Sequence, residues 1–82
     1  MNQADARTVV LEVLAGIAPE IDGTDLDPDA ELGVELDLDS MDFLNLVDGV
    51  SARVGRDIPE HDYPHLTTLA AFGAYLASPP AV

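Results

Sequence analysis

The clearest pattern in this chain runs through residues 35–47, which read ELDLDSMDFLNLV. Carboxylates lead up to a serine, and apolar residues with helical spacing begin directly after it. Asp39 suits the N-cap position, because its side-chain oxygen can accept a backbone N–H of the first turn. Asp42, three residues later, can reach back as in a capping box, and both charges favour the positive end of a helix. The segment therefore predicts a helix that begins at Ser40, with the serine hydroxyl free to face solvent.

The neighbours of Ser40 do not suit a nucleophile. Asp37, Asp39 and Asp42 surround it, and no base stands beside it in the sequence. A Ser-His-Asp triad would also need an oxyanion hole, and the glycine-framed turn of many nucleophilic serines is absent. We therefore interpret Ser40 as an attachment point and expect that this chain alone is not an enzyme.

The segments before Ser40 predict one helix and one long loop. The helix is expected from about Ala4 to Ala18, where Pro19 stops it. Its apolar stripe consists of Ala6, Val10, Val13, Leu14 and Ile17. Residues 20–39 are rich in acids and turn formers, and we expect an ordered loop in which Gly33 allows a backbone turn. The aliphatics expected to pin this loop to the core are Ile21, Leu26, Leu32, Val34, Leu36 and Leu38.

Three further helices are expected after the loop. The second helix should span about Ser40 to Val54 and end at Gly55. A short helix should open at Pro59 and close before Pro64. A last helix should be capped by Thr67 or Thr68 and stopped by Ser78-Pro79-Pro80. The expected fold is an all-α, small four-helix bundle, with three longer helices and one short one, in a single domain over residues 1–82.

The helix after Ser40 has two distinct sides. The residues gathered on its apolar side are Phe43, Leu46, Val47, Val50 and Val54, with Leu44 at the margin. The residues on the opposite side are Asp42, Asn45, Asp48, Gly49 and Ala52. Because this second side begins at Ser40, it is where a protein approaching the serine would rest. An ordinary solvated face fits the same periodicity.

The charge balance restricts the classes of partner. The 82 residues include 16 acids against three arginines, which gives a net charge of −13. Such a chain repels nucleic acids and anionic membrane surfaces and attracts basic proteins. Cysteine is absent, which excludes disulfides and thiolate metal sites. With no secretory signal and no membrane-spanning run, we expect a cytoplasmic monomer.

A metal site is not expected from the sequence. Asp25, Asp27 and Asp29 resemble the start of a calcium loop, but Ala30 and Leu36 stand where that loop needs Gly and Glu. His61 and His65 are separated by Pro64, which disrupts the helical face that would pair them. Loose divalent binding and a calcium-responsive acidic domain stay open.

The order of these segments resembles the acyl carrier protein family along nearly the whole chain. Asp39-Ser40-Met41, with the apolar pattern that follows it, is similar to the family's Asp-Ser-Leu/Met motif. The Asp57-Ile58-Pro59 turn and the Leu66-Thr67-Thr68-Leu69 entry to the last helix also look like the family's. In that family the serine carries a 4′-phosphopantetheine arm, whose thiol holds acyl groups as thioesters.

The resemblance implies specific partners and site residues. A phosphopantetheinyl transferase would attach the arm from coenzyme A to Ser40, and acyl-loading and acyl-transfer enzymes with basic docking surfaces would follow. The residues expected to recognise these partners are Asp37, Asp39, Met41, Asp42, Asn45 and Asp48. The candidates for lining an acyl pocket are Phe43, Leu44, Val47 and Ile58.

Departures from the family pattern widen the choice of pathway. Met41 replaces the usual leucine, and Ser51, Ala52 and Arg53 dilute the acidic character of the second helix. The resemblance therefore implies an acyl carrier in fatty-acid, polyketide or specialised lipid biosynthesis. The alternatives are an aminoacyl carrier similar to those of D-alanine and an unmodified acidic helical module that binds a basic protein.

Overall fold

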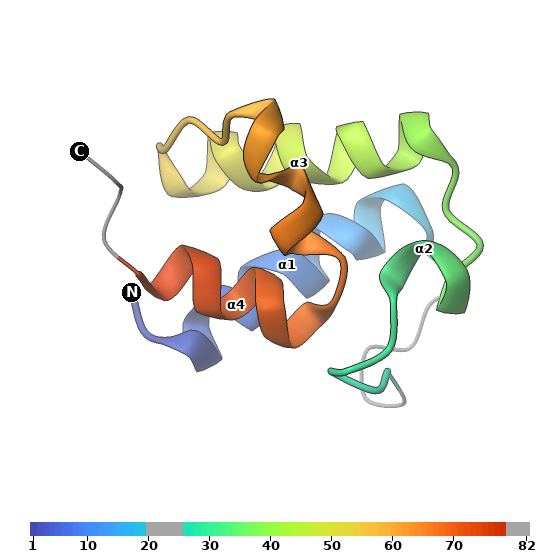
Figure 1. The fold of residues 1–82 in the computed structure, drawn as a ribbon, viewed down its shortest axis with the longest axis horizontal. Helices are drawn as coiled ribbons and strands as arrows, with labels where there is room; N and C mark the ends of the chain where they lie inside the picture. The colour runs from blue at the N-terminus through green and yellow to red at the C-terminus, as the bar shows by residue number, and fades with distance from the viewer. Residues whose placement is uncertain (20–25, 79–82) are drawn as a thin grey trace.

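A computed structural model of the chain describes residues 1–19 and 26–78 (Figure 1). Its helices are α1 Gln3–Ile17, α2 Leu32–Glu35, α3 Ser40–Val54, the 3₁₀ helix η2 Glu60–Leu66 and α4 Leu69–Ala77. No strand occurs in these two ranges, where Glu31 and Thr68 form only an isolated bridge. The expected all-α bundle of three longer helices and a short one is confirmed. The short α2 inside the expected loop was not predicted.

α1 packs against both α3 and α4. The Asn2 side chain caps it by accepting a hydrogen bond from the Asp5 N–H at 2.8 Å. Three residues of the expected stripe, Ala6, Val10 and Leu14, are buried, and Val13 and Ile17 lie half-buried beside them. α1 thus supplies the surface on which the two other long helices rest.

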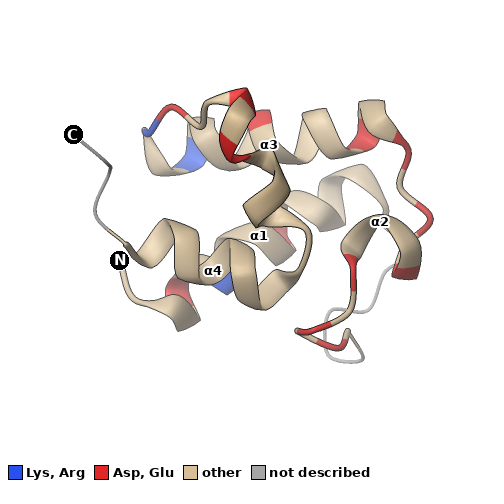
Figure 2. Cartoon of the chain, viewed as in Figure 1, with Lys and Arg blue, Asp and Glu red and all other residues tan. Residues whose placement is uncertain are grey.

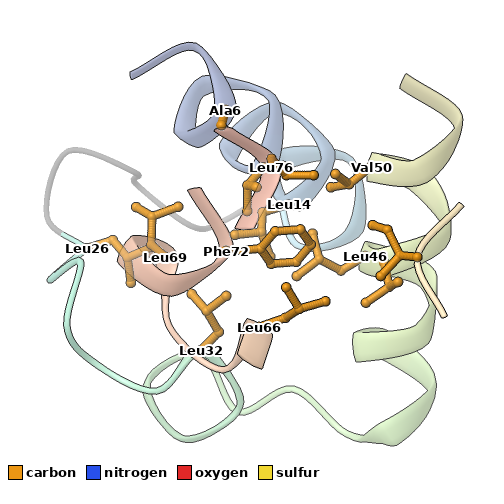
Figure 3. Packing of buried hydrophobic residues seen from close by; sticks show 13 residues of the cluster. Ala6, Leu14, Leu26, Leu32, Leu46, Val50, Leu66, Leu69, Phe72 and Leu76 are labelled. Atoms are coloured by element: carbon orange, nitrogen blue, oxygen red, sulfur yellow. The ribbon is translucent and has the colours of Figure 1, made fainter. Parts of the chain in front are cut away.

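Phe72 of α4 lies at the centre of the core and is fully buried. Figure 3 shows its ring among leucines from every side of the bundle. The labelled neighbours are Leu14, Leu46, Leu66, Leu69 and Leu76. Burial of this apolar area is the main stabilising contribution to the fold, at roughly 25 cal/mol per Å².

The segment between α1 and α3 is pinned to the core by fewer aliphatics than expected. Leu26 and Leu32 are buried, and Leu36 and Leu38 are half-buried. The prediction for Val34 is wrong, because its side chain is 76% exposed. α2 carries Leu32 inward, and Val34, two residues later, is turned away from the core by the helical rotation. Ile21 lies outside the described residues.

Within the described residues 26–39 of the loop, Asp37 has a positive φ and Gly33 does not. Asp37 has a φ of 53°, which is the left-handed region that aspartate tolerates better than most residues. Gly33 lies within α2, where an added Cβ would meet only the Leu38 carbonyl oxygen at an ordinary 3.7 Å. The expectation that Gly33 makes the turn is therefore wrong.

η2 continues past the proline at which it was expected to close. It spans Glu60–Leu66 and includes Pro64. A 3₁₀ helix has φ values close to the fixed φ of proline, so its backbone accommodates Pro64 at the cost of one hydrogen-bond donor. At the entry to α4, Thr68 is the cap, since its hydroxyl accepts from the Ala71 N–H at 3.0 Å.

Gly49 belongs to α3, and it faces Val13 of α1 and not solvent. A Cβ at this position would lie 2.7 Å from Cγ1 of Val13, closer than side chains normally approach. Its assignment to the solvent side of the helix is corrected accordingly. The glycine weakens α3 locally, but it lets the two helices approach closely where Val13 is stiff at χ1.

The Gly49→Ala variant should therefore be less stable than the native chain, although alanine is the better helix former. We expect a loss of about 1–3 kcal/mol from overpacking against Val13, measured by urea denaturation. Gly16→Ala is the matched control, because an added Cβ there meets nothing within 4 Å and should stabilise by about 0.5–1 kcal/mol. The Val13→Ala change should partly rescue Gly49→Ala in a double-mutant cycle. Equal stabilisation by the two glycine substitutions would contradict this account.

Candidate functional site

Ser40 is the first residue of α3 and is exposed. The Asp39 side chain caps the helix, because its Oδ1 accepts from the Asp42 N–H at 2.8 Å. This confirms the predicted cap, although no reciprocal bond from the Asp42 carboxylate accompanies it among the described residues. Since Asp39 performs the capping, Ser40 is not needed for it. No hydrogen bond links the Ser40 hydroxyl to another described residue, so the hydroxyl is available to react.

Backbone contacts with the start of α4 hold the segment that precedes Ser40. The Leu32 N–H donates to the Thr67 carbonyl at 2.7 Å, and the Ala70 N–H donates to the Pro28 carbonyl at 2.9 Å. Leu32 itself is fully buried. The segment that leads to Asp39 and Ser40 is therefore held in place at Pro28 and Leu32 by the start of α4.

A groove of about 560 Å³ opens beside Ser40, which forms part of its lining. One wall comes from the segment around α2, the second from the first turn of α3, and the third from η2. Its apolar lining consists of Val34, Leu38, Phe43, Leu44, Tyr63 and Pro64. The exposed Val34 is thus one side of a hollow. A group attached to Ser40 has an apolar surface directly beside it.

The four acyl-pocket candidates fall into two places. Phe43 and Leu44 line the groove. Val47 is 1% exposed and Ile58 is 9% exposed, and both belong to the core cluster instead. Tyr63, which sequence reasoning did not single out, also lines the groove and meets Phe43 edge to face.

The six residues expected to recognise partners lie in the segment before Ser40 and along the first half of α3. Met41 is 71% exposed, and Asp42 is half-buried. The others are exposed: Asp37, Asp39, Asn45 and Asp48. Red segments in Figure 2 mark acidic residues in and around α2 and at the start of α3, whereas the blue segments at the far end of α3 mark arginines. The face around Ser40 is therefore strongly negative with an apolar residue within it.

The arginines near the end of α3 take part in structural contacts. Arg53 forms an ion pair with Glu12 of α1. Arg56 stacks over the Tyr75 ring at 4.6 Å and donates to the Tyr75 and Ser78 carbonyls at 3.2 and 2.9 Å. At 1.5 Å per residue, Arg53 lies about 20 Å along the helix from Ser40. Because of this distance and these contacts, neither arginine neutralises the carboxylates around Ser40.

Asp62 and Tyr75 connect η2 to α4. The Tyr75 hydroxyl donates to Oδ2 of Asp62 at 2.8 Å. Burial, together with this bond and the charge of Asp62, raises the pKa of Tyr75, and Arg56 opposes the shift. This contact joins residues far apart in the sequence, and no local pattern indicated it. It fixes the wall of the groove that carries Tyr63.

Within residues 1–19 and 26–78, no group of three or more metal-ligating side chains is close enough to hold an ion. Asp27 instead accepts from the Asp29 N–H at 2.9 Å, while Asp25 lies outside the described residues. His61 is 3.4 Å from Asp62, and His65 is exposed at the end of η2. The histidines form no cluster with each other.

A comparison with protein families matches residues 8–76 to the phosphopantetheine attachment site family. The chain belongs to this family. Its cofactor is 4′-phosphopantetheine, joined covalently, and phosphopantetheinyl transferases modify such carrier domains. No curated protein matched the sequence. No helix in the described part of the carrier is both long and apolar enough to cross a membrane.

The carrier should lose stability as pH rises above about 10, because the neutral Tyr75 phenol donates to Asp62. Folding raises the pKa of Tyr75, so the stability from this hydrogen bond is fully present at pH values below the unfolded-state pKa. It is lost as the pH rises through the folded-state pKa. Tyr75→Phe should cost about 0.5–1.5 kcal/mol at neutral pH and show a smaller alkaline loss.

Melting temperatures measured from about pH 8 to about pH 11 test this expectation. The sequence lacks lysine and cysteine and has two tyrosines, so few other side chains titrate in that range. Tyr63→Phe is the matched control and should keep the native pH dependence. The same alkaline loss in Tyr75→Phe would contradict the role of this bond.

Proposed function

We propose that Ser40 is the residue to which 4′-phosphopantetheine is attached, and that the chain carries acyl groups in fatty-acid, polyketide or specialised lipid biosynthesis. The observation that supports this most is the exposed hydroxyl of Ser40 at the start of α3, which has no hydrogen-bond partner among the described residues. Ser51 is a poorer acceptor, because its hydroxyl donates to the Arg56 carbonyl at 2.6 Å. Ser78 likewise donates to the Ala74 carbonyl at 2.9 Å.

The residues around Ser40 fit the group. When attached, phosphopantetheine supplies a thiol that holds an acyl group as a thioester. The positive end of α3 favours the phosphate on Ser40, and the carboxylates of Asp37, Asp39 and Asp42 oppose it. A transferase that approaches this face must therefore offset the carboxylates with its own cations. This requirement makes the acidic face a means of selecting basic partners.

The groove beside Ser40 supports an acyl cargo. Phe43 and Leu44 present apolar surface there, and each methylene that leaves water contributes about 0.8 kcal/mol. Leu44 is 45% exposed and Met41 is 71% exposed, so both are also available to an apolar contact with a partner enzyme. The outer face of α3, with Asn45 and Asp48, would continue that contact.

An aminoacyl cargo is the second candidate, and the rim of the groove favours it. Glu31, Asp39 and Glu60 all contribute to the lining. Their carboxylates would attract the ammonium group of an aminoacyl thioester. Comparison of alanyl and butyryl forms of the modified chain distinguishes the two. If the alanyl form has the higher melting temperature, and if about 0.5 M salt abolishes the difference, an aminoacyl cargo is favoured over an acyl cargo.

Attachment is tested by intact mass after incubation with coenzyme A, magnesium and a broad-specificity phosphopantetheinyl transferase. We expect the native chain to gain one phosphopantetheine group and Ser40→Ala to gain none. Ser51→Ala is the matched control and should be modified like the native chain. A folded native chain that stays unmodified would refute the proposal and leave the unmodified acidic module as the better reading.

The acidic face should govern the rate of modification. Asp37→Asn should lower kcat/KM of the transferase about twofold to fivefold, the effect of an exposed charge pair worth up to about 1 kcal/mol. Asparagine also tolerates the left-handed backbone at this position, so the fold should be unaffected. Asp57→Asn removes the same charge from an exposed position beyond α3 and should leave the rate unchanged. Equal effects of the two changes would mean that only net charge matters.

A further inference from the structure

We infer that the rings of Phe43 and Tyr63 form a floor that limits how deeply an acyl chain can enter the groove. The carrier would then hold short acyl groups in preference to long unbranched ones. This inference rests on the proposed function, since it concerns the cargo held on the arm at Ser40.

The two rings close the groove from opposite walls. Phe43 comes from the first turn of α3, and Tyr63 comes from η2. Their centroids are 5.8 Å apart with an interplanar angle of 77°, which is an edge-to-face pair. Both residues line the groove and also pack against the core cluster. The pair therefore separates the open groove from the buried interior.

Each ring is followed on the same side of its helix by a buried aliphatic core residue. Val47 lies one helical turn after Phe43 and is 1% exposed, and Leu66 lies three residues after Tyr63 and is fully buried. These spacings place each aliphatic on the same side of its helix as the ring before it. Neither residue lines the groove. A chain that grew past the rings would meet a packed interior.

Tyr63 is held in place by its neighbour in η2. Oδ2 of Asp62 accepts a hydrogen bond from the Tyr75 hydroxyl at 2.8 Å, and the Arg56 guanidinium stacks on the Tyr75 ring. Movement of the η2 backbone at Tyr63 would displace Asp62 and break this connection to α4. The wall that carries Tyr63 is consequently held against α4. Methylenes beyond the groove would then stay in water, where they add nothing to stability.

The inference is tested by loading the chain from acyl coenzymes A with a phosphopantetheinyl transferase and measuring melting temperature. The series is acetyl, butyryl, hexanoyl, octanoyl and dodecanoyl, each compared with the same variant carrying the unacylated arm. In the native carrier the melting temperature should rise with chain length and level off within the series, once the acyl chain fills the groove above the two rings. In Tyr63→Ala it should continue to rise, with dodecanoyl about 5 °C or more above octanoyl.

Two further variants keep the result interpretable. Val54→Ala removes a half-buried aliphatic near the end of α3 that does not line the groove, and it should keep the native levelling-off point. Tyr63→Leu retains bulk against the core, and it replaces Tyr63→Ala if the alanine variant fails to fold. A native chain stabilised further by dodecanoyl than by octanoyl would overturn the inference, as would an unchanged levelling-off point in the Tyr63 variants. Intact mass checks loading separately, so absence of acyl-pantetheine would count against the proposed function and not against the floor.

Discussion

The arrangement around Ser40 depends on two backbone hydrogen bonds that fasten the preceding segment to the start of α4. The bonds from Leu32 to Thr67 and from Ala70 to Pro28 bring segments together that are far apart in the chain. Because Leu32 is also fully buried, α2 has a fixed position from which the chain reaches the Asp39 cap. The same attachment places one wall of the groove opposite η2. The position of the serine and of one wall of the groove thus depends on this tertiary contact.

Opposite charges have different roles at the two ends of α3. Near its C-terminal end, Arg53 pairs with Glu12 of α1, and Arg56 donates to the Tyr75 and Ser78 carbonyls at the end of α4. Near its N-terminal end, the carboxylates around Ser40 are largely exposed and contribute little to packing. A face with uncompensated charge raises the rate of encounter with basic proteins and loses that advantage in salt. This division is consistent with a carrier that must meet several enzymes while its fold stays unchanged.

Local features of the sequence predicted much of the fold and part of the site. The limits of α3, the Asp39 cap and the Thr68 cap depend on residues that are close together in the sequence. They could therefore be predicted from the sequence alone. The exposure of Val34, the contact of Gly49 with Val13 and the pair formed by Phe43 with Tyr63 depend on which helices meet. Periodicity identifies an apolar side but not the partner that covers it. Val47 and Phe43 share such a side, yet only Phe43 reaches the groove.

The most direct test of this account is to locate the phosphopantetheine group by peptide mapping of the modified chain. A fragmentation series that places the added mass on Ser40, and leaves Ser51 and Ser78 unmodified, is the predicted result. Ser51 and Ser78 already donate to backbone carbonyls, whereas the Ser40 hydroxyl has no described partner. Added mass on either of those serines, or on a threonine, would contradict the claim that the capped start of α3 presents the attachment site.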